Sequence, residues 1–294
     1  MKLRRAIHLL FLFFLFAPAW VCAPASGSPP GLSVFVSIIP QKYFVQKIGG
    51  NHVTVAAMVR PGANPATYEP RPSQMAALAS ARLYFAIGVP FERAWMKRIA
   101  AANPRMRIVP TQQGIEKMPM APFFGESTPR RRGILDPHIW LSPRLVKIQA
   151  GHITRALAEA DPLHRNQYQE NYRRFAAELD ALDSDLKQMF AGREGMEFMV
   201  FHPSWGYFAH DYGLRQVPVE IEGKTPKPAR LKELIEYARR RGIRLILVQP
   251  QFSRKSAELI ARAIGAHVVT ADPLAENWAQ NLRRCAAAIQ KALK

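Results

Sequence analysis

The chain has 294 residues, of which 48% are hydrophobic and 21% charged, a balance typical of a globular protein and not of a disordered one. Its formal net charge of +19 raises a nucleic-acid-binding hypothesis. The basic residues are scattered, however, with short clusters only at positions 130–132 and 239–241, and no zinc-finger spacing or RNA-binding aromatic motif accompanies them. We therefore expect a solvated basic surface and no nucleic-acid partner; an unspecified anionic partner is the alternative.

Residues 1–25 have the pattern of a secretory signal peptide, which predicts export to the periplasm. Basic residues precede an apolar run over 6–21, and small residues at 23–25 supply a cleavage site. The run is too short to indicate a membrane span. Cys22 leaves lipid attachment as an alternative, although the bulky residues before it do not fit a lipobox. Only Cys285 then remains after cleavage, so no internal disulfide is expected.

Residues 26–141 predict a first α/β lobe, because short apolar runs alternate with helical patterns of about ten residues. The expected strands are 32–39, 53–59, 83–88 and 106–110, and the expected helices are 41–48, 73–81 (capped by Ser73) and 92–102. A turn rich in Pro, Gly and Asn occupies 60–72, and 114–133 is expected to be a loop.

Residues 142–192 predict a helical connection with helices at 143–159 and 163–191. The second helix carries an apolar stripe at alternating spacings of four and three, from Tyr168 to Met189. At 1.5 Å per residue it is about 42 Å long, enough to run along two lobes. A coiled-coil partner is the alternative, but packing onto the chain's own body suits an α/β pattern better, and we expect a monomer.

Residues 193–294 predict a second lobe of the same kind. Its expected strands are 197–201, 215–221, 243–249 and 267–271, and its expected helices are 205–212, 228–241, 253–264 and 275–293. The predicted fold class is therefore α/β: two lobes, each with a four-stranded, mainly parallel sheet flanked by helices, joined by one long rigid helix. A Pro followed by Tyr-Phe after the first strand of each half is a weak internal echo that supports duplication.

Three polar residues with proline neighbours stand out as candidate metal ligands. His138 sits in a stiff turn, framed by Pro137 and by the predicted helix start at Ser142, while His202 and Asp272 directly follow predicted strands. Ligands bind beyond the carboxyl ends of the strands in open parallel sheets, which predicts a cleft between the lobes. Two imidazoles and a carboxylate suit a divalent transition metal such as Zn²⁺ or Mn²⁺.

Each candidate also has a structural alternative. His202 alone is as well explained by a hydrogen bond to a backbone carbonyl, and Asp272 alone by an N-cap. Trp140 and Trp205, beside the two framed histidines, are interpreted as cleft walls or as core. The other histidines of the mature chain lack proline framing and are expected to be structural or at the surface; they are His52, His152, His164, His210 and His267.

Several motifs together resemble one family, the zinc- and manganese-binding periplasmic subunits of ABC importers. They are Asp-Pro-His-Ile-Trp-Leu-Ser-Pro at 136–143, His-Pro at 202–203 with Gly-Tyr-Phe at 206–208, Asp-Tyr-Gly-Leu at 211–214, Gln-Pro-Gln-Phe at 249–252, Asp-Pro-Leu at 272–274, Pro-Gly-Ala-Asn-Pro at 61–65, Tyr-Glu-Pro at 68–70 and Pro-Ser at 72–73. The resemblance covers nearly all of the mature chain in the right order. It implies two α/β lobes joined by a backbone helix, with the metal held between the lobes by His138, His202 and Asp272.

The chain departs from that family at Ala66, where members usually have their first ligand histidine. A methyl group cannot coordinate a metal, so water or a neighbour such as Glu69 would complete a tetrahedral site. The loop over 114–133 also lacks the histidines that zinc-specific members often carry there, which leaves zinc, manganese and iron open.

The predicted function is that of a periplasmic receptor, not an enzyme, that captures Zn²⁺ or Mn²⁺ as cargo and delivers it to an ABC permease in the inner membrane, with no organic cofactor. Affinity should fall as the pH drops through about 6.5, because only neutral imidazole coordinates. The alternatives are a receptor for another ligand such as a metal chelate, an exported metallohydrolase with Glu69 as base, and an adhesin on the same scaffold.

Overall fold

The computed structural model describes residues 31–120, 134–220 and 226–293. The predicted signal peptide, residues 1–25, lies outside them, as do parts of the loop predicted over 114–133 and the last residue of the strand predicted over 215–221. Within the described ranges, no helix is long and apolar enough to cross a membrane.

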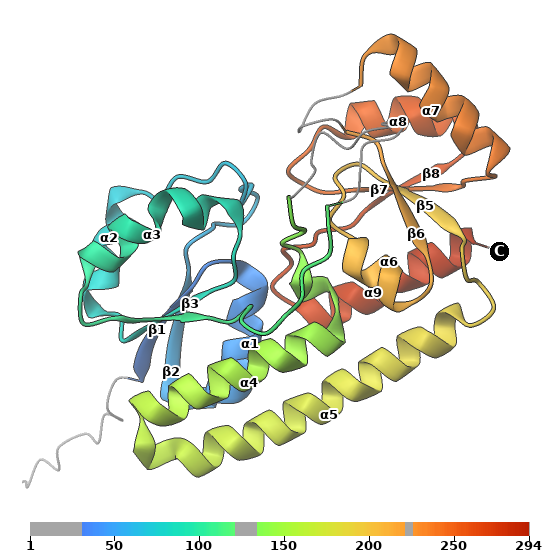
Figure 1. Cartoon of the computed structure of the whole chain (residues 1–294). Helices are drawn as coiled ribbons and strands as arrows, with labels where there is room; N and C mark the ends of the chain where they lie inside the picture. The colour runs from blue at the N-terminus through green and yellow to red at the C-terminus, as the bar shows by residue number, and fades with distance from the viewer. Residues whose placement is uncertain (1–30, 121–133, 221–225, 294) are drawn as a thin grey trace, which may run out of the picture.

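The first lobe is a four-stranded parallel sheet in the order β2-β1-β3-β4, with helices on both faces (Figure 1). Its strands are β1 (Leu32–Val36), β2 (Val53–Ala57), β3 (Leu83–Ala86) and β4 (Arg107–Pro110), and its helices are α1 (Ile39–Gly49), α2 (Pro72–Ala77) and α3 (Pro90–Ala102). The N-cap of α2 is Arg71, with Pro72 as first helical residue, so the predicted cap at Ser73 is wrong by two positions. A proline at the first helical position needs no N–H partner, which explains the earlier start.

The second lobe repeats the same topology, with the order β6-β5-β7-β8 and parallel pairing throughout. Its strands are β5 (Glu197–Val200), β6 (Arg215–Pro218), β7 (Leu245–Val248) and β8 (His267–Thr270), and its helices are α6 (Gly206–Asp211), α7 (Pro228–Arg240), α8 (Arg254–Ile264) and α9 (Trp278–Ala292). β7 is buried along its whole length, as the continuous apolar run predicts. The predicted fold class, two four-stranded parallel sheets flanked by helices, is confirmed.

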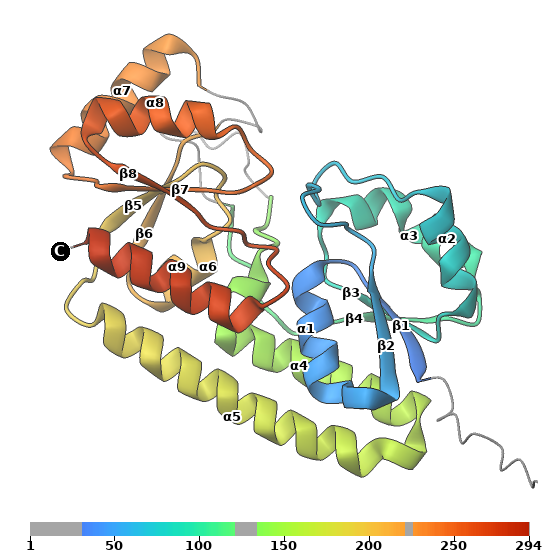
Figure 2. The same cartoon turned by 180° about the vertical axis from the view of Figure 1, so that it is seen from behind.

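Two helices lie beneath the sheets: α4 (Pro143–Ala160) runs under the first lobe, and the longer α5 (Arg165–Phe190) runs along both lobes (Figures 1 and 2). α5 packs against α1 of the first lobe, against α4, and against α9 of the second lobe. Phe44 of α1 lies against Trp278 of α9, with ring centroids 5.2 Å apart, and against Phe175 of α5, at 6.1 Å. One hydrophobic core therefore continues from the first lobe through the long helix into the second. A separate cluster fills the space under α7 and α8.

Both sheets point the carboxyl ends of their strands toward the gap between the lobes (Figures 1 and 2). The turns that leave those ends therefore meet there, and the sequence candidates lie on several of them.

Candidate metal centre

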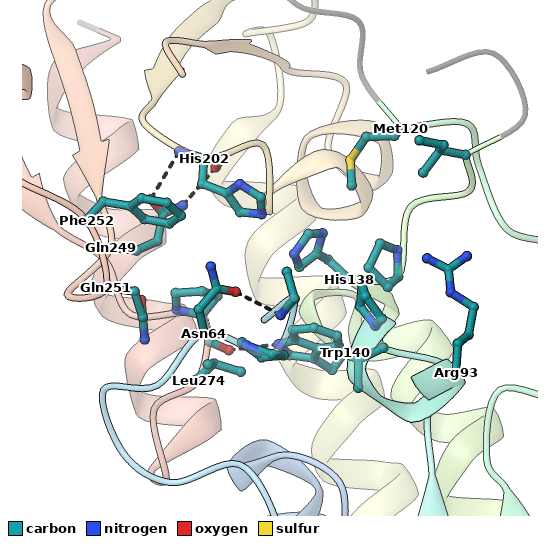
Figure 3. A pocket seen from close by; sticks show the side chains of 17 residues that line it. Asn64, Arg93, Met120, His138, Trp140, His202, Gln249, Gln251, Phe252 and Leu274 are labelled. Atoms are coloured by element: carbon teal, nitrogen blue, oxygen red, sulfur yellow. Dashed lines mark hydrogen bonds between the residues drawn. The ribbon is translucent and has the colours of Figure 1, made fainter. Parts of the chain in front are cut away.

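A cavity of about 360 Å³ lies between the lobes, where the turns after the strands meet (Figure 3). The first lobe contributes the Asn64–Ala66 turn after β2 and the start of α3, and the second contributes turns after β5, β7 and β8. His138 and His202 both line it. This is the edge at which a parallel sheet binds ligands, as the sequence analysis predicts.

His138 is held by the turn that the proline-flanked sequence predicts. Ser142 is the N-cap of α4 and accepts a hydrogen bond from the Leu145 N–H at 3.3 Å, with Pro143 as first helical residue. Asp136, only 1% exposed, accepts from the His138 N–H at 2.9 Å and lies 2.6 Å from Nδ1 of the His138 ring. A carboxylate can only accept, so Nδ1 carries the proton and Nε2 keeps its lone pair for a metal.

His202 is oriented in the same way by a more distant residue. Its Nδ1 lies 2.8 Å from Oε1 of Glu220, which is 1% exposed and follows β6. Gln249, after β7, fixes the backbone on both sides: its Oε1 accepts from the His202 N–H at 3.1 Å and its Nε2 donates to the His202 carbonyl at 2.8 Å. The ring of Phe252 stacks on the imidazole with centroids 5.3 Å apart. Glu220 was not among the residues predicted from the sequence.

The two imidazoles meet at a distance that suits a shared ion. Their ring centroids are 5.3 Å apart and the rings are inclined by 73°. With a zinc–nitrogen distance of about 2.0–2.1 Å and a tetrahedral angle, two imidazoles on one ion have centroids about 5 Å apart. The structure thus brings together the two histidines that the sequence selects.

Asp272 and Glu69, the other two predicted ligands, do not line the cavity. Asp272 is partly buried between β8 and α9, and its Oδ1 accepts from the Leu274 N–H at 2.9 Å; Pro273 and Leu274 line the cavity, but Asp272 does not. Glu69 is exposed and also lies outside the lining. Across residues 31–120, 134–220 and 226–293, no three His, Cys, Asp or Glu side chains are grouped closely enough to hold a metal. The ligand roles of Asp272 and Glu69 stay predictions.

The turn after β8 is tied to the histidine turn by two tryptophans. The Trp140 indole N–H donates to the Pro273 carbonyl at 2.7 Å, and the Trp278 indole N–H donates to the Trp140 carbonyl at 2.7 Å. Trp140 lines the cavity and is buried, so it is both wall and core; Trp205 is fully buried and does not line it. The Asp272 turn is therefore fixed relative to His138.

Asp136 is enclosed by the second lobe as well as by its own turn. The Tyr207 hydroxyl donates to the Asp136 carbonyl at 3.0 Å. A Cβ on Gly206, at the start of α6, would lie 2.7 Å from Asp136 Oδ2, so only glycine allows this approach. Asp136 also interacts electrostatically with Lys117: burial lowers the pKa of Lys117, and the negative charges of Glu92 and Asp136 oppose that effect.

Two inward-facing, carboxylate-anchored imidazoles between duplicated α/β lobes define a metal-binding solute receptor of the kind that serves membrane importers. The chain belongs to the family described as zinc-uptake complex component A, periplasmic (ZnuA), whose model matches residues 34–292.

Individual relatives agree with this assignment. The high-affinity zinc uptake system protein ZnuA of Bacillus subtilis is 27% identical over 243 residues, which cover 80% of this chain and 76% of that protein. A crystal structure of ZnuA is 44% identical with a TM-score of 0.84, covering 90% of this chain and 100% of that one. A zinc-bound ZnuA deletion mutant is 44% identical with a TM-score of 0.83, covering 90% and 98%.

Proposed function

We propose that this chain is a periplasmic receptor that captures a divalent transition metal, zinc in the first place, and hands it to an ABC permease. The observation that carries the proposal is the pair His138 and His202, 5.3 Å apart between ring centroids and each anchored at Nδ1 by a buried carboxylate. The zinc-bound relative and the zinc-uptake family support zinc as cargo. Manganese stays the alternative, with weaker binding expected at imidazole nitrogens.

Asp272 is our proposed third ligand, because it lies on the turn that the indole N–H of Trp140 binds through the Pro273 carbonyl. To reach the ion its carboxylate would leave the Leu274 N–H, to which it is bonded at 2.9 Å. Glu69 is the alternative donor for a remaining position, and it would have to turn inward from an exposed site. The core that continues through α5 favours a small tilt of the lobes on binding over a wide closure.

The same proposal includes export by residues 1–25 as a signal peptide, a monomeric receptor and no nucleic-acid partner. It also includes reversible coordination without catalysis. The framed histidines have their Nδ1 atoms engaged by carboxylates, an arrangement that fixes ligands in place and serves tight binding.

Calorimetric titration of the metal-stripped mature chain with Zn²⁺ and with Mn²⁺ tests the proposal. We expect one saturable site, with zinc bound more tightly than manganese. His138→Ala and His202→Ala should each weaken zinc binding by more than about a hundredfold, since loss of a ligand costs more than loss of its outer partner. Absence of saturable binding, or full affinity in both variants, would contradict it.

A further inference from the structure

The cavity between the lobes is much larger than a metal ion requires. Its volume is about 360 Å³, whereas a water molecule takes up about 30 Å³ in the liquid. Cavities of about 300–1,000 Å³ are the size that holds small organic molecules. The space next to His138 and His202 could therefore hold a metal together with a small molecule.

The protein leaves coordination positions for such a molecule. Two imidazoles reach the cavity, and no third His, Cys, Asp or Glu joins them among the residues that the structure describes. If Asp272 turned inward, one position of a tetrahedral ion would still be open. Ala66 lines the wall at the end of the Asn64–Ala66 turn and offers only a methyl group.

The cavity wall carries hydrogen-bond donors that a bare cation cannot use. Arg93 of α3, an exposed residue, lines the edge of the cavity, and Figure 3 shows Arg93 and His202 on opposite sides of His138. No ion pair of Arg93 is found within the described part of the chain. The Nε2 of Gln251, another lining residue, is buried and has no hydrogen-bond partner there.

These donors suit an anion. A guanidinium in the cavity of a divalent cation adds like-charge repulsion, which an anionic companion of the metal would cancel. Guanidinium and amide N–H groups both pair with carboxylate oxygens, and arginine does so with two parallel hydrogen bonds. Oxygen donors of a carboxylate also bind zinc, at about 2.0–2.2 Å.

Resting on the proposed function, we infer that the cargo is a metal complex with a small polycarboxylate chelator. One carboxylate of the chelator coordinates the metal beside His138 and His202, in the space that Ala66 leaves. A second carboxylate accepts hydrogen bonds from the guanidinium of Arg93. Glu69 is then not needed at the metal.

Equilibrium dialysis of the full mature chain, stripped of metal, tests this with ⁶⁵Zn²⁺ and ¹⁴C-labelled citrate, and in parallel with labelled malate. We expect the native chain to retain about one citrate or malate per zinc, and at least tenfold less of either without zinc. Arg93→Gln should lower the retained carboxylate per zinc at least fivefold. Lys97→Gln, which removes one positive charge from an exposed position of the same helix, is the matched control and should match the native ratio.

Ala66→His offers a second test in the same assay. An imidazole placed at this wall would take the open position, so zinc should stay bound while the labelled carboxylate is displaced at least fivefold.

Each other result counts against the inference. Retention of zinc with neither citrate nor malate would overturn it and leave the metal receptor standing. Equal carboxylate retention by Arg93→Gln and Lys97→Gln would also overturn it. Failure to retain zinc under any of these conditions would overturn the proposed function together with it.

Discussion

The two lobes share one sheet topology but hold their histidines at the cavity by different contacts. In the first lobe, Asp136 holds His138 from two residues away within one turn, whereas in the second Glu220 reaches His202 from the end of the neighbouring strand. The first lobe presents Ala66 in the turn after β2, and the second presents the Asp272 turn after β8. The two lobes thus share their sheet topology and differ in the side chains that they present to the cavity.

Asp272→Asn tests whether the second lobe supplies two metal ligands, and it has the largest expected effect. Asparagine can still accept from the Leu274 N–H, so the turn should keep its shape. We expect zinc affinity to fall by more than about a hundredfold, as for loss of a ligand. Competition against a chromogenic zinc chelator measures it. Glu69→Gln, the comparison variant in the first lobe, should change affinity by less than about threefold; a larger loss there than at Asp272 would reverse the assignment.

Asp136→Asn and Glu220→Gln compare the two anchors directly. Each should lower zinc affinity by about 10–100-fold, because an amide in place of the carboxylate no longer enforces the ring tautomer. We expect losses of similar size in the two variants, because each carboxylate faces the ring Nδ1 of its histidine at 2.6 Å or 2.8 Å. Asp180→Asn, which removes an exposed carboxylate paired with Lys147, is the control and should bind like the native chain. If both anchor variants matched this control, the anchors would not matter for binding.

Gly206→Ala tests the contact between α6 of the second lobe and the carboxylate of Asp136. The new methyl group would press on Asp136 Oδ2 at 2.7 Å and so tilt the His138 ring. We expect a loss of zinc affinity of up to about tenfold, below that of removing the carboxylate itself. Gly151→Ala in α4, where the nearest atom to the new Cβ is 3.8 Å away, controls for adding a methyl group. Equal affinity in the two variants would show that Asp136 yields to the methyl group without consequence.

His164 and Asp161 form another imidazole–carboxylate pair, with Nδ1 2.7 Å from Oδ2, at the junction of α4 and α5 and away from the cavity. Asp161 also accepts from Tyr168 at 2.6 Å, and His52 stacks on His164 with centroids 3.7 Å apart. Burial works to raise the pKa of Asp161, but the hydrogen bonds from Tyr168 and His164 outweigh it and hold the pKa below its ordinary value of 3.8.

Asp161→Asn should therefore affect stability and not metal binding. Because the pKa of Asp161 is lower in the folded state than in the unfolded state, its ionised carboxylate stabilises the fold at pH values above the ordinary pKa of 3.8. This contribution is lost as the pH falls through the pKa of the folded state. We expect the variant to lose about 1 kcal/mol at pH 7, with the gap to the native chain narrowing below about pH 4. Urea unfolding across pH measures it. A gap that widened in acid would contradict the sign.

Most of the fold could be predicted because both halves alternate short apolar runs with amphipathic helices. β7 and α5 lie within two residues of their expected bounds. The last helix begins at Trp278 and not at the expected residue 275, because the turn that starts at Asp272 takes up the chain before it. Local signals of this kind do not depend on how the lobes meet.

The sequence predicts the two histidines of the site but not the residues that surround them. Proline framing and strand ends identify His138 and His202, but the partner of His202 depends on strand pairing. Val200 is in register with Pro218, so positions 202 and 220 fall side by side beyond the sheet, a signal that exists only once the register is known. Neither the approach of Gly206 to Asp136 nor the presence of Arg93 in the cavity has a local signal, because both depend on how the lobes and helices pack.

Zinc K-edge X-ray absorption on the loaded chain tests the central claim most directly, by counting the imidazoles on the metal. We predict two, with nitrogen at about 2.0–2.1 Å and oxygen in the remaining positions. The imidazole scattering should fall by about half in His138→Ala and in His202→Ala when these are loaded at high protein concentration. A native spectrum without imidazole scattering, or one that neither substitution changes, would contradict the account.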